Sequence, residues 1–230
     1  MRPVGSVLAM TGHVYVVAGD ITKVGCDAWL LPTDGAFRIS GSFAEAVGVM
    51  PNGLLKGHEW GDSRVTRYRE SPDVGPEIWL ANVGLVPNDP ENDPSWFLDV
   101  VEPFASAAKS RQKPAPDLPP RLAIPVLGTG EGGMDAAKGG IYRSLLPEMQ
   151  AVAEEHDVDL MLVCWGRRSF SAAQRVRRDL LVDRSLADLW DMGPKTDELV
   201  VSARQRGEVA RDGQMVLFLG AGASAGAGFP

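Results

Sequence analysis

The chain has 230 residues, with 23 lysine and arginine side chains against 30 aspartate and glutamate side chains, so its formal net charge is −7. This length suits one domain of about 150–200 residues plus an appendage. The composition, 44% hydrophobic and 23% charged, is that of a globular protein and excludes a chain disordered throughout. The acidic balance argues against a general nucleic-acid coat or a binder of anionic membranes, because phosphates are met by clustered lysine or arginine.

The remaining compositional features exclude further classes. Two cysteines, Cys26 and Cys164, and three histidines lack the spacing of a zinc site, so we predict no metal and two small buried thiols in a reducing, cytoplasmic setting. The chain opens without a signal-peptide pattern and has no apolar run near the ~20 residues of a membrane helix. Five arginines form the nearest approach to a basic cluster, which we interpret as a solvated helix face: Arg167, Arg168, Arg175, Arg177 and Arg178.

Short apolar runs that end in glycine or other turn-forming residues recur along the chain. Five of them predict strands: Val14–Ala18, Ala28–Leu31, Ile78–Val83, Leu122–Leu127 and Asp159–Trp165. Because these runs are continuously hydrophobic rather than alternating, they predict a sheet covered by helices on both faces.

Helical periodicity separates several of these runs. Apolar residues from Trp96 to Ala108 recur at helical spacing after an Asp93-Pro94 cap. Further helices are predicted over Ala136–Glu155, with a kink or a division at Gly139-Gly140 and Pro147, and over Ser171–Trp190 and Asp197–Arg211. The pattern predicts an α/β domain of mixed topology in residues 1–170, a helical connector in 171–213, and one more strand that starts near residue 214.

Two strand ends carry residues suited to a ligand. Gly128-Thr129-Gly130-Glu131-Gly132-Gly133 follows one predicted strand and precedes a helix, where backbone N–H groups and the helix dipole favour a phosphate; the alternative is a flexible turn. Gly19-Asp20-Ile21-Thr22 follows the first strand, and Asp20 there either caps the next turn or accepts a hydrogen bond from an adenine amino group.

These motifs carry a resemblance to the macro domain family. Gly19–Thr22 followed by Asp27–Asp34 resembles the family's opening, Trp79–Gly84 its middle strand, and Ala123–Gly133 its phosphate loop, in the same order over residues 13–166. The resemblance implies a three-layer α/β/α sandwich with a mixed sheet that binds ADP-ribose or a related NAD metabolite and needs no cofactor.

The resemblance also implies roles for single residues. Asp20 is expected to accept from the adenine amino group, Ile21 to offer its backbone N–H, and Asp34 to accept from ribose hydroxyls. The diphosphate is assigned to the loop residues Gly128, Thr129, Gly130, Glu131, Gly132 and Gly133. Trp165, after the last strand, is expected either to lie against the adenine or to be an ordinary core aromatic.

The chain departs from the family where hydrolytic members carry a pair of asparagines. Leu31 and Asp34 occupy those two positions, and the glycine run that follows in the family reads here as Gly35–Phe43. A leucine cannot orient a ribose hydroxyl or a water, and the charge of Asp34 repels a nearby phosphate unless Arg38 offsets it; the alternative for Arg38 is a solvated side chain. We therefore favour a binding domain over a hydrolase and assign no catalytic residue.

The C-terminal residues carry a second resemblance. Residues 214–230, an apolar strand followed by Gly-Ala-Gly-Ala-Ser and a closing Gly-Phe-Pro, look like the first NAD-binding motif of the sirtuin (SIR2) family. The resemblance assigns NAD to Gly220, Ala221, Gly222 and Ser224 as the truncated start of a second domain. It implies a longer parent protein whose SIR2-like part consumes NAD.

Three functional hypotheses follow. In the first, the macro-like domain senses ADP-ribose or another NAD-derived nucleotide and regulates the SIR2-like part, an arrangement that resembles bacterial anti-phage defence effectors. In the second, it removes ADP-ribose from protein or nucleic acid, with Asp34 replacing the usual asparagine. In the third, it is a scaffold that binds no ligand and docks partners through its helices. A homo-oligomer is expected to form through either the connector or the missing C-terminal domain.

Overall fold

The computed structural model describes residues 12–61, 63–68, 75–84, 94–111, 119–128, 138–181 and 195–215. The chain divides into two compact units, Thr11–Leu180 and a second made of Met1–Met10 with Leu181–Pro230. The second unit contributes one described helix, α7 (Thr196–Arg211), which has no buried residue. None of the described helices is both long and apolar enough to cross a bilayer.

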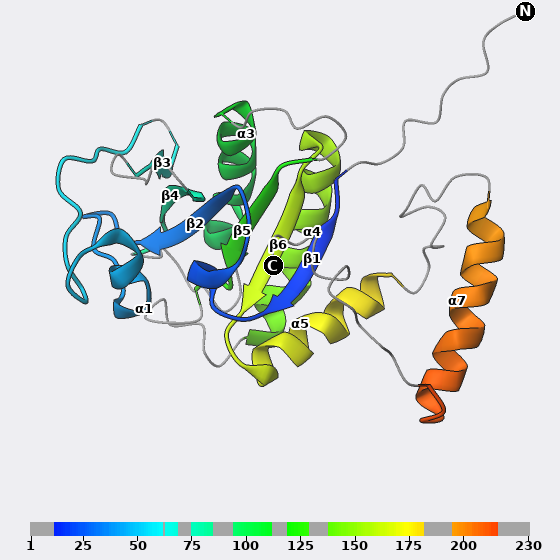
Figure 1. Ribbon diagram of the computed structural model, residues 1–230. Helices are drawn as coiled ribbons and strands as arrows, with labels where there is room; N and C mark the ends of the chain where they lie inside the picture. Colours follow the sequence, from blue (N-terminus) through cyan, green and yellow to red (C-terminus); the bar gives the residue numbers. More distant parts are fainter. Residues whose placement is uncertain are drawn as a thin grey trace, which may run out of the picture. The chain divides into compact units, whose positions relative to one another are not determined.

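The first unit is built on a six-stranded mixed sheet in the order β1-β6-β5-β2-β4-β3 (Figure 1). Five strands run parallel and β3 pairs antiparallel with β4 at the edge. The strands are β1 (Val14–Ala18), β2 (Ala28–Thr33), β3 (Val65–Arg67), β4 (Glu77–Asn82), β5 (Arg121–Pro125) and β6 (Asp159–Cys164).

Helices and short turns cover both faces of this sheet. The bounds are η1 (Ile21–Lys23), α1 (Gly41–Ala44), η2 (Glu45–Val47), α2 (Ser95–Leu98), α3 (Val101–Arg111), α4 (Lys138–His156) and α5 (Arg167–Leu180). Alternate strand residues such as Leu30 and Ile124 join the core under α2 to α5, whereas Leu31 and Leu80 join a second core with η1, α1 and η2. The predicted three-layer α/β/α sandwich is therefore confirmed (Figure 1).

The five predicted strands form within a few residues of their predicted bounds, but β2 is longer than expected. It continues through Pro32 and Thr33, which the sequence placed in a turn. Pro32 has no N–H to donate to a neighbouring strand. It is tolerated because β2 pairs with β5 only at Ala28 and Trp29, so no hydrogen bond to β5 is lost at Pro32.

Two helices differ from their predictions. The helix expected across 96–108 forms as α2 and α3, because Pro103 has no N–H to donate to the preceding turn and so favours the first turn of a new helix. Of the kink or division expected at Pro147, the division does not occur: α4 continues through this residue. Pro147 is exposed, so water can satisfy the carbonyl that loses its partner.

Helix α5 lies along the edge strand β1. Gln174 Nε2 donates to the carbonyl oxygen of Val16 at 3.5 Å, and Arg177 Nε donates to that of Val14 at 3.3 Å. These side chains cover carbonyl groups that an edge strand leaves unpaired. The sequence placed residues after 170 in a connector, whereas α5 packs within the first unit up to Leu180, burying Ala173.

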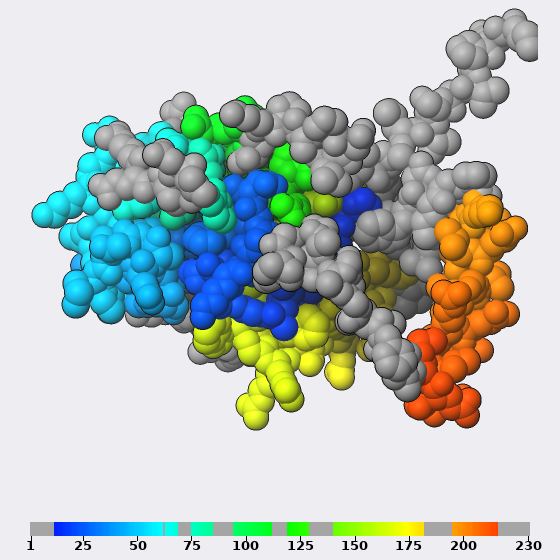
Figure 2. Space-filling view, viewed as in Figure 1, coloured from blue at the N-terminus to red at the C-terminus, as the bar shows by residue number. Residues whose placement is uncertain are grey.

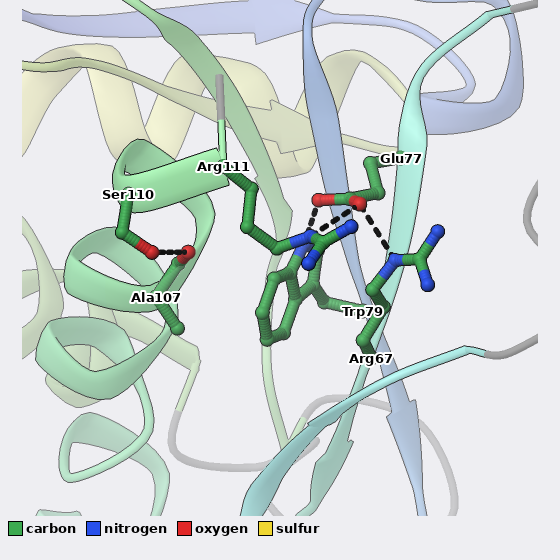
Figure 3. Close-up of polar contacts among 6 residues, drawn as sticks. All are labelled: Arg67, Glu77, Trp79, Ala107, Ser110 and Arg111. Atoms are coloured by element: carbon green, nitrogen blue, oxygen red, sulfur yellow. Dashed lines mark hydrogen bonds and ion pairs between the residues drawn. The ribbon is translucent and has the colours of Figure 1, made fainter. Parts of the chain in front are cut away.

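A carboxylate at the start of β4 joins two arginines and an indole (Figure 3). Glu77 Oε1 accepts from Arg67 Nε at 2.6 Å and from Arg111 Nε at 2.8 Å, while Oε2 accepts from Trp79 Nε1 at 3.0 Å. Burial of the carboxyl group raises its pKa, but the hydrogen bonds from Arg111, Arg67 and Trp79 together outweigh burial, so the pKa of Glu77 lies below its ordinary value.

Replacing Glu77 by glutamine is expected to lower the free energy of unfolding at pH 7 by about 1–3 kcal/mol, because two charged hydrogen bonds are weakened. A depressed folded-state pKa stabilises the protein above the unfolded value of 4.5, and this contribution is lost as the pH falls through the folded pKa. Denaturant unfolding should therefore show a deficit that stays constant from pH 7 down to about pH 5 and shrinks only as the pH falls below 4.5. The exposed Glu59→Gln variant is the control, and a deficit independent of pH contradicts the assignment.

Candidate functional site

The parallel strands bring their carboxyl ends to one edge of the sheet, where ligands of open α/β sheets bind. The register places Ala18 beside Cys164 and Thr33 beside Asn82. The residues that follow these strand ends were predicted from separate parts of the sequence, and the structure gathers them at one edge: Asp20, Ile21, Asp34, Gly128 and Trp165. The predicted loop residues Thr129–Gly133 lie outside the described residues.

Asp20 caps the short helix η1. Its Oδ1 accepts from the backbone N of Thr22 at 3.0 Å and from Thr22 Oγ1 at 2.8 Å. Both contacts use the same oxygen, so neither occupies Oδ2. Ile21 opens η1, and the N–H of a first helical residue has no acceptor within its helix. The capping role is therefore confirmed, and it is compatible with the adenine role.

Trp165 directly follows β6 and is 76% exposed, so the prediction of an ordinary core aromatic is wrong. It lies next to the first strand's end, because the N–H of Gly19 donates to the carbonyl of Cys164 at 3.1 Å. Gly166 then turns the chain into α5 with a φ of +82°, a conformation that favours glycine. An exposed indole on the strand end next to the one that precedes Asp20 is an aromatic surface available to a planar base.

Asp34 organises the turn after β2. Its Oδ1 accepts from the backbone N of Ala36 at 2.9 Å and from that of Arg38 at 2.8 Å. Gly84, at the end of the neighbouring strand, approaches so closely that a Cβ on it would lie 2.6 Å from the Cβ of Asp34. Arg38 is exposed, as expected for a solvated side chain.

The segment after Asp34, where the family resemblance expects glycines, forms a small aromatic structure instead. The Phe37 ring stacks on Trp60 with centroids 4.1 Å apart, and Trp60 Nε1 donates to the carbonyl of Gly35 at 2.9 Å. His58 stacks on Tyr68 at 5.2 Å. These contacts fix bulky side chains around the turn that carries Asp34.

Sequence reasoning missed the residues that secure the end of β4. Arg64 Nη1 donates to the carbonyls of Asn82 at 3.2 Å and Trp96 at 2.8 Å, and its guanidinium lies 3.7 Å from the Trp96 ring centroid. Among the described residues, no donor reaches the buried Oδ1 of Asn82. No local signal predicts these contacts, since they join residues 18 and 32 positions apart.

The amino ends of the parallel strands, opposite the candidate site, hold ionisable groups whose pKa values are shifted by burial or by neighbouring charged groups. His13 Nδ1 lies 3.1 Å from Asp159 Oδ1, and burial raises the pKa of Asp159. Glu77 is held by arginines, as described above. Burial also raises the pKa of the Cys26 thiol, before β2, to about 12, and that of the Cys164 thiol, at the carboxyl end of β6, to about 11. Both thiols are therefore protonated near neutral pH and are poor nucleophiles. Cys164 is buried as predicted, whereas Cys26 is partly exposed.

A mixed six-stranded sheet between two helical layers, with its loops gathered at the carboxyl edge, defines the macrodomain fold. Among similar solved structures, the Oceanobacillus iheyensis macrodomain with ADP is 17% identical, with a TM-score of 0.55, covering 75% of this chain and 94% of that one. The Trypanosoma brucei macrodomain in complex with ADP is 16% identical, with a TM-score of 0.53, covering 72% of this chain and 69% of that one. A variant of the O. iheyensis protein with ADPR is 17% identical, with a TM-score of 0.55, covering 75% of this chain and 96% of that one.

No protein-family model and no curated protein matches the chain. At these identities the similarity to solved structures establishes the fold. The SIR2-like motif with Gly220, Ala221, Gly222 and Ser224 lies outside the described residues and stays a prediction.

Proposed function

We propose that the first unit binds ADP-ribose or a closely related NAD-derived nucleotide at the carboxyl edge of its sheet. The observation that carries the proposal is that two suitable groups follow neighbouring strand ends: Asp20, whose capping bonds leave Oδ2 unoccupied, and Trp165, which is 76% exposed. A carboxylate oxygen accepts from an adenine amino group, and an indole stacks on the adenine ring.

Two further observations support the same ligand class. Gly128 has a φ of +76° at the end of β5 and starts the glycine-rich sequence to which we assign the diphosphate. The macrodomain structures named above contain ADP or ADPR. The turn around Asp34 is assigned to the ribose that follows the diphosphate.

Isothermal titration with ADP-ribose, NAD and AMP tests the proposal, and Asp20→Asn is the sharpest variant. The asparagine keeps a capping oxygen but turns an amide donor toward the adenine amino group, so the affinity for ADP-ribose is expected to fall about 10- to 150-fold while stability is retained. The hypoxanthine analogue of ADP-ribose carries an acceptor in place of that amino group and should bind this variant better than the parent.

The matched control is Thr22→Val, which removes one hydrogen bond to Asp20 Oδ1 without touching the ligand side. Absence of binding to all three nucleotides by the folded parent chain overturns the proposal. Equal losses in Asp20→Asn and Thr22→Val assign Asp20 to capping alone.

The wider role rests on the two sequence resemblances. We propose that nucleotide binding by the first unit regulates a SIR2-like, NAD-consuming part in a cytoplasmic anti-phage defence protein. Support comes from the order of the motifs along the chain: the macro-like residues come first and the Gly-Ala-Gly-Ala-Ser motif follows at 220–224.

A further inference from the structure

Helix α5 carries five arginines and one aspartate in a chain whose net charge is −7. Four of these arginines, Arg167, Arg168, Arg175 and Arg178, are exposed. At 3.6 residues per turn, all four fall within an arc of about 100° around the helix axis and span about 16 Å along it. They lie on one side of the helix, with the exposed Ser171 between Arg168 and Arg175 and the exposed Asp179 at the border of the arc; we call these four arginines the arginine stripe.

The arginine stripe is not used to hold the described part of the fold together. Arg177, outside the stripe, donates to the carbonyl of Val14, whereas none of the four stripe arginines forms an ion pair with an acidic side chain in the described ranges. The opposite side of α5, with Phe170, Ala173 and Val176, packs against the core. Figure 2 shows the α5 side chains, in yellow, at the molecular surface.

The stripe also opposes the helix that carries it. The N-terminus of a helix has a partial positive charge, and each cation there costs about 0.3–1 kcal/mol. Arg167 and Arg168 occupy the first turn of α5, which has no acidic residue. A local arrangement that lowers helix stability is typical of a functional site, and bound anions would reverse the sign of this interaction.

Trp165 lies two residues before Arg167, at the N-terminal end of the stripe, and is 76% exposed. Surfaces that bind single-stranded nucleic acid combine a row of cations along the backbone with aromatic rings on which bases stack. Arginine suits this role, because its planar guanidinium matches phosphate oxygens. We propose that the arginine stripe and Trp165 bind a single-stranded nucleic acid, with phosphates along α5 and a base on the indole.

Two other partners fit the same observations less well. A helix that lies in an anionic membrane surface inserts an exposed apolar face, and the apolar face of α5 is buried in the core. An acidic polypeptide accounts for the arginines, but it offers no planar base to the exposed indole at the end of the stripe. The net charge of −7 argues against a protein that binds nucleic acid over its whole surface. It does not argue against binding at one local stripe of arginines.

The test uses the 230-residue chain and a fluorescein-labelled single strand of about 20 deoxythymidines. Anisotropy titrations against salt should give a slope of log affinity on log salt near −2.8, about −0.7 for each of four phosphates. Arg175→Ala with Arg178→Ala should flatten the slope to about −1.4 and lower affinity about 25-fold at about 0.1 M salt. Trp165→Ala should lower affinity about 5- to 150-fold and leave the slope unchanged.

The matched control is Arg204→Ala with Arg206→Ala, an equal loss of charge at exposed positions of α7. Absence of binding by the parent, or equal losses in the two double variants, overturns the proposal. Competition by polyglutamate as effective as that of unlabelled strand also overturns it and assigns the stripe to acidic polypeptides. The Arg175/Arg178 variant should keep its affinity for ADP-ribose, so failure here is distinguishable from failure of the proposed nucleotide site.

Discussion

Replacing Gly128 by alanine is expected to lower the free energy of unfolding by about 2–5 kcal/mol, combining two costs. The φ of +76° at this position is left-handed, which costs an L-residue about 1–2 kcal/mol. A Cβ would also lie 2.9–3.0 Å from three carbons of the Phe97 ring. Phe97 is fully buried, so its ring has no free space into which to move, and overpacking adds about 1–3 kcal/mol.

The matched control for this substitution is Gly166→Ala. Gly166 has a similar φ of +82°, but a Cβ there meets no atom within 4 Å. It therefore pays the conformational cost without the clash, and denaturant unfolding should separate the two variants by about 1–3 kcal/mol. In a Phe97→Leu background, whose own cost is measured separately, Gly128→Ala should cost less than in the parent chain, because the smaller side chain leaves room for the methyl group. Equal losses at Gly128 and Gly166 contradict the proposed contact.

The same substitution reports on the ligand site. Gly128 starts the loop assigned to the diphosphate, so a shifted backbone at this residue should weaken ADP-ribose binding in addition to lowering stability. Gly166→Ala lies next to Trp165 and is expected to affect binding through the position of the indole. Titration calorimetry on both variants, at a temperature where each is folded, checks these effects.

Five strands were predictable because their central residues are continuously apolar, a pattern that burial on both faces produces. Strand β3 has three residues and carries no such pattern, so it escaped prediction. The division between α2 and α3 was missed because the apolar stripe from Trp96 to Ala108 continues across it. There, the place where α3 begins is determined by Pro103 rather than by the apolar periodicity.

The candidate site was predictable where its residues directly follow strands. Asp20 and Trp165 came from strand-end positions, and the parallel register necessarily brings those ends to one edge. The sequence could not decide between two environments for Trp165, because exposure depends on the path of the chain after Gly166. The aromatic structure around Phe37 was also unpredictable, since the contact with Trp60 joins residues across a turn whose backbone no local motif specifies.

Replacing Arg64 by methionine is expected to lower the free energy of unfolding by about 2–4 kcal/mol, although the residue carries no recognisable motif. Methionine keeps much of the side-chain bulk but leaves the carbonyls of Asn82 and Trp96 without their donor. It also removes the guanidinium from the Trp96 ring. The ion pair with Asp99 contributes little, because the Asp99 side chain is 63% exposed.

Three variants separate these contributions in denaturant unfolding. Asp99→Asn should cost less than about 1 kcal/mol, because it removes an exposed ion pair and leaves the carbonyl contacts intact. Arg64→Lys keeps the charge but has no planar fork to reach two carbonyls while stacking on an indole, so it should recover less than half of the loss. Arg38→Met is the exposed control and should be close to neutral. Full recovery by lysine assigns the effect to charge alone and contradicts the geometric explanation.

The Arg64 substitution also tests how the fold positions the site. Arg64 joins the end of β4 to α2, and the chain then passes through Gly84, whose close approach to Asp34 leaves no room for a Cβ. Loosening this junction should let the Asp34 turn shift away from a bound ribose. We therefore expect Arg64→Met to weaken ADP-ribose binding at a temperature where the variant is fully folded. Glu77→Gln, at the opposite end of β4, should lower stability but leave the affinity for ADP-ribose unchanged. Equal affinities in these two variants mean that the end of β4 does not position the ribose end of the site.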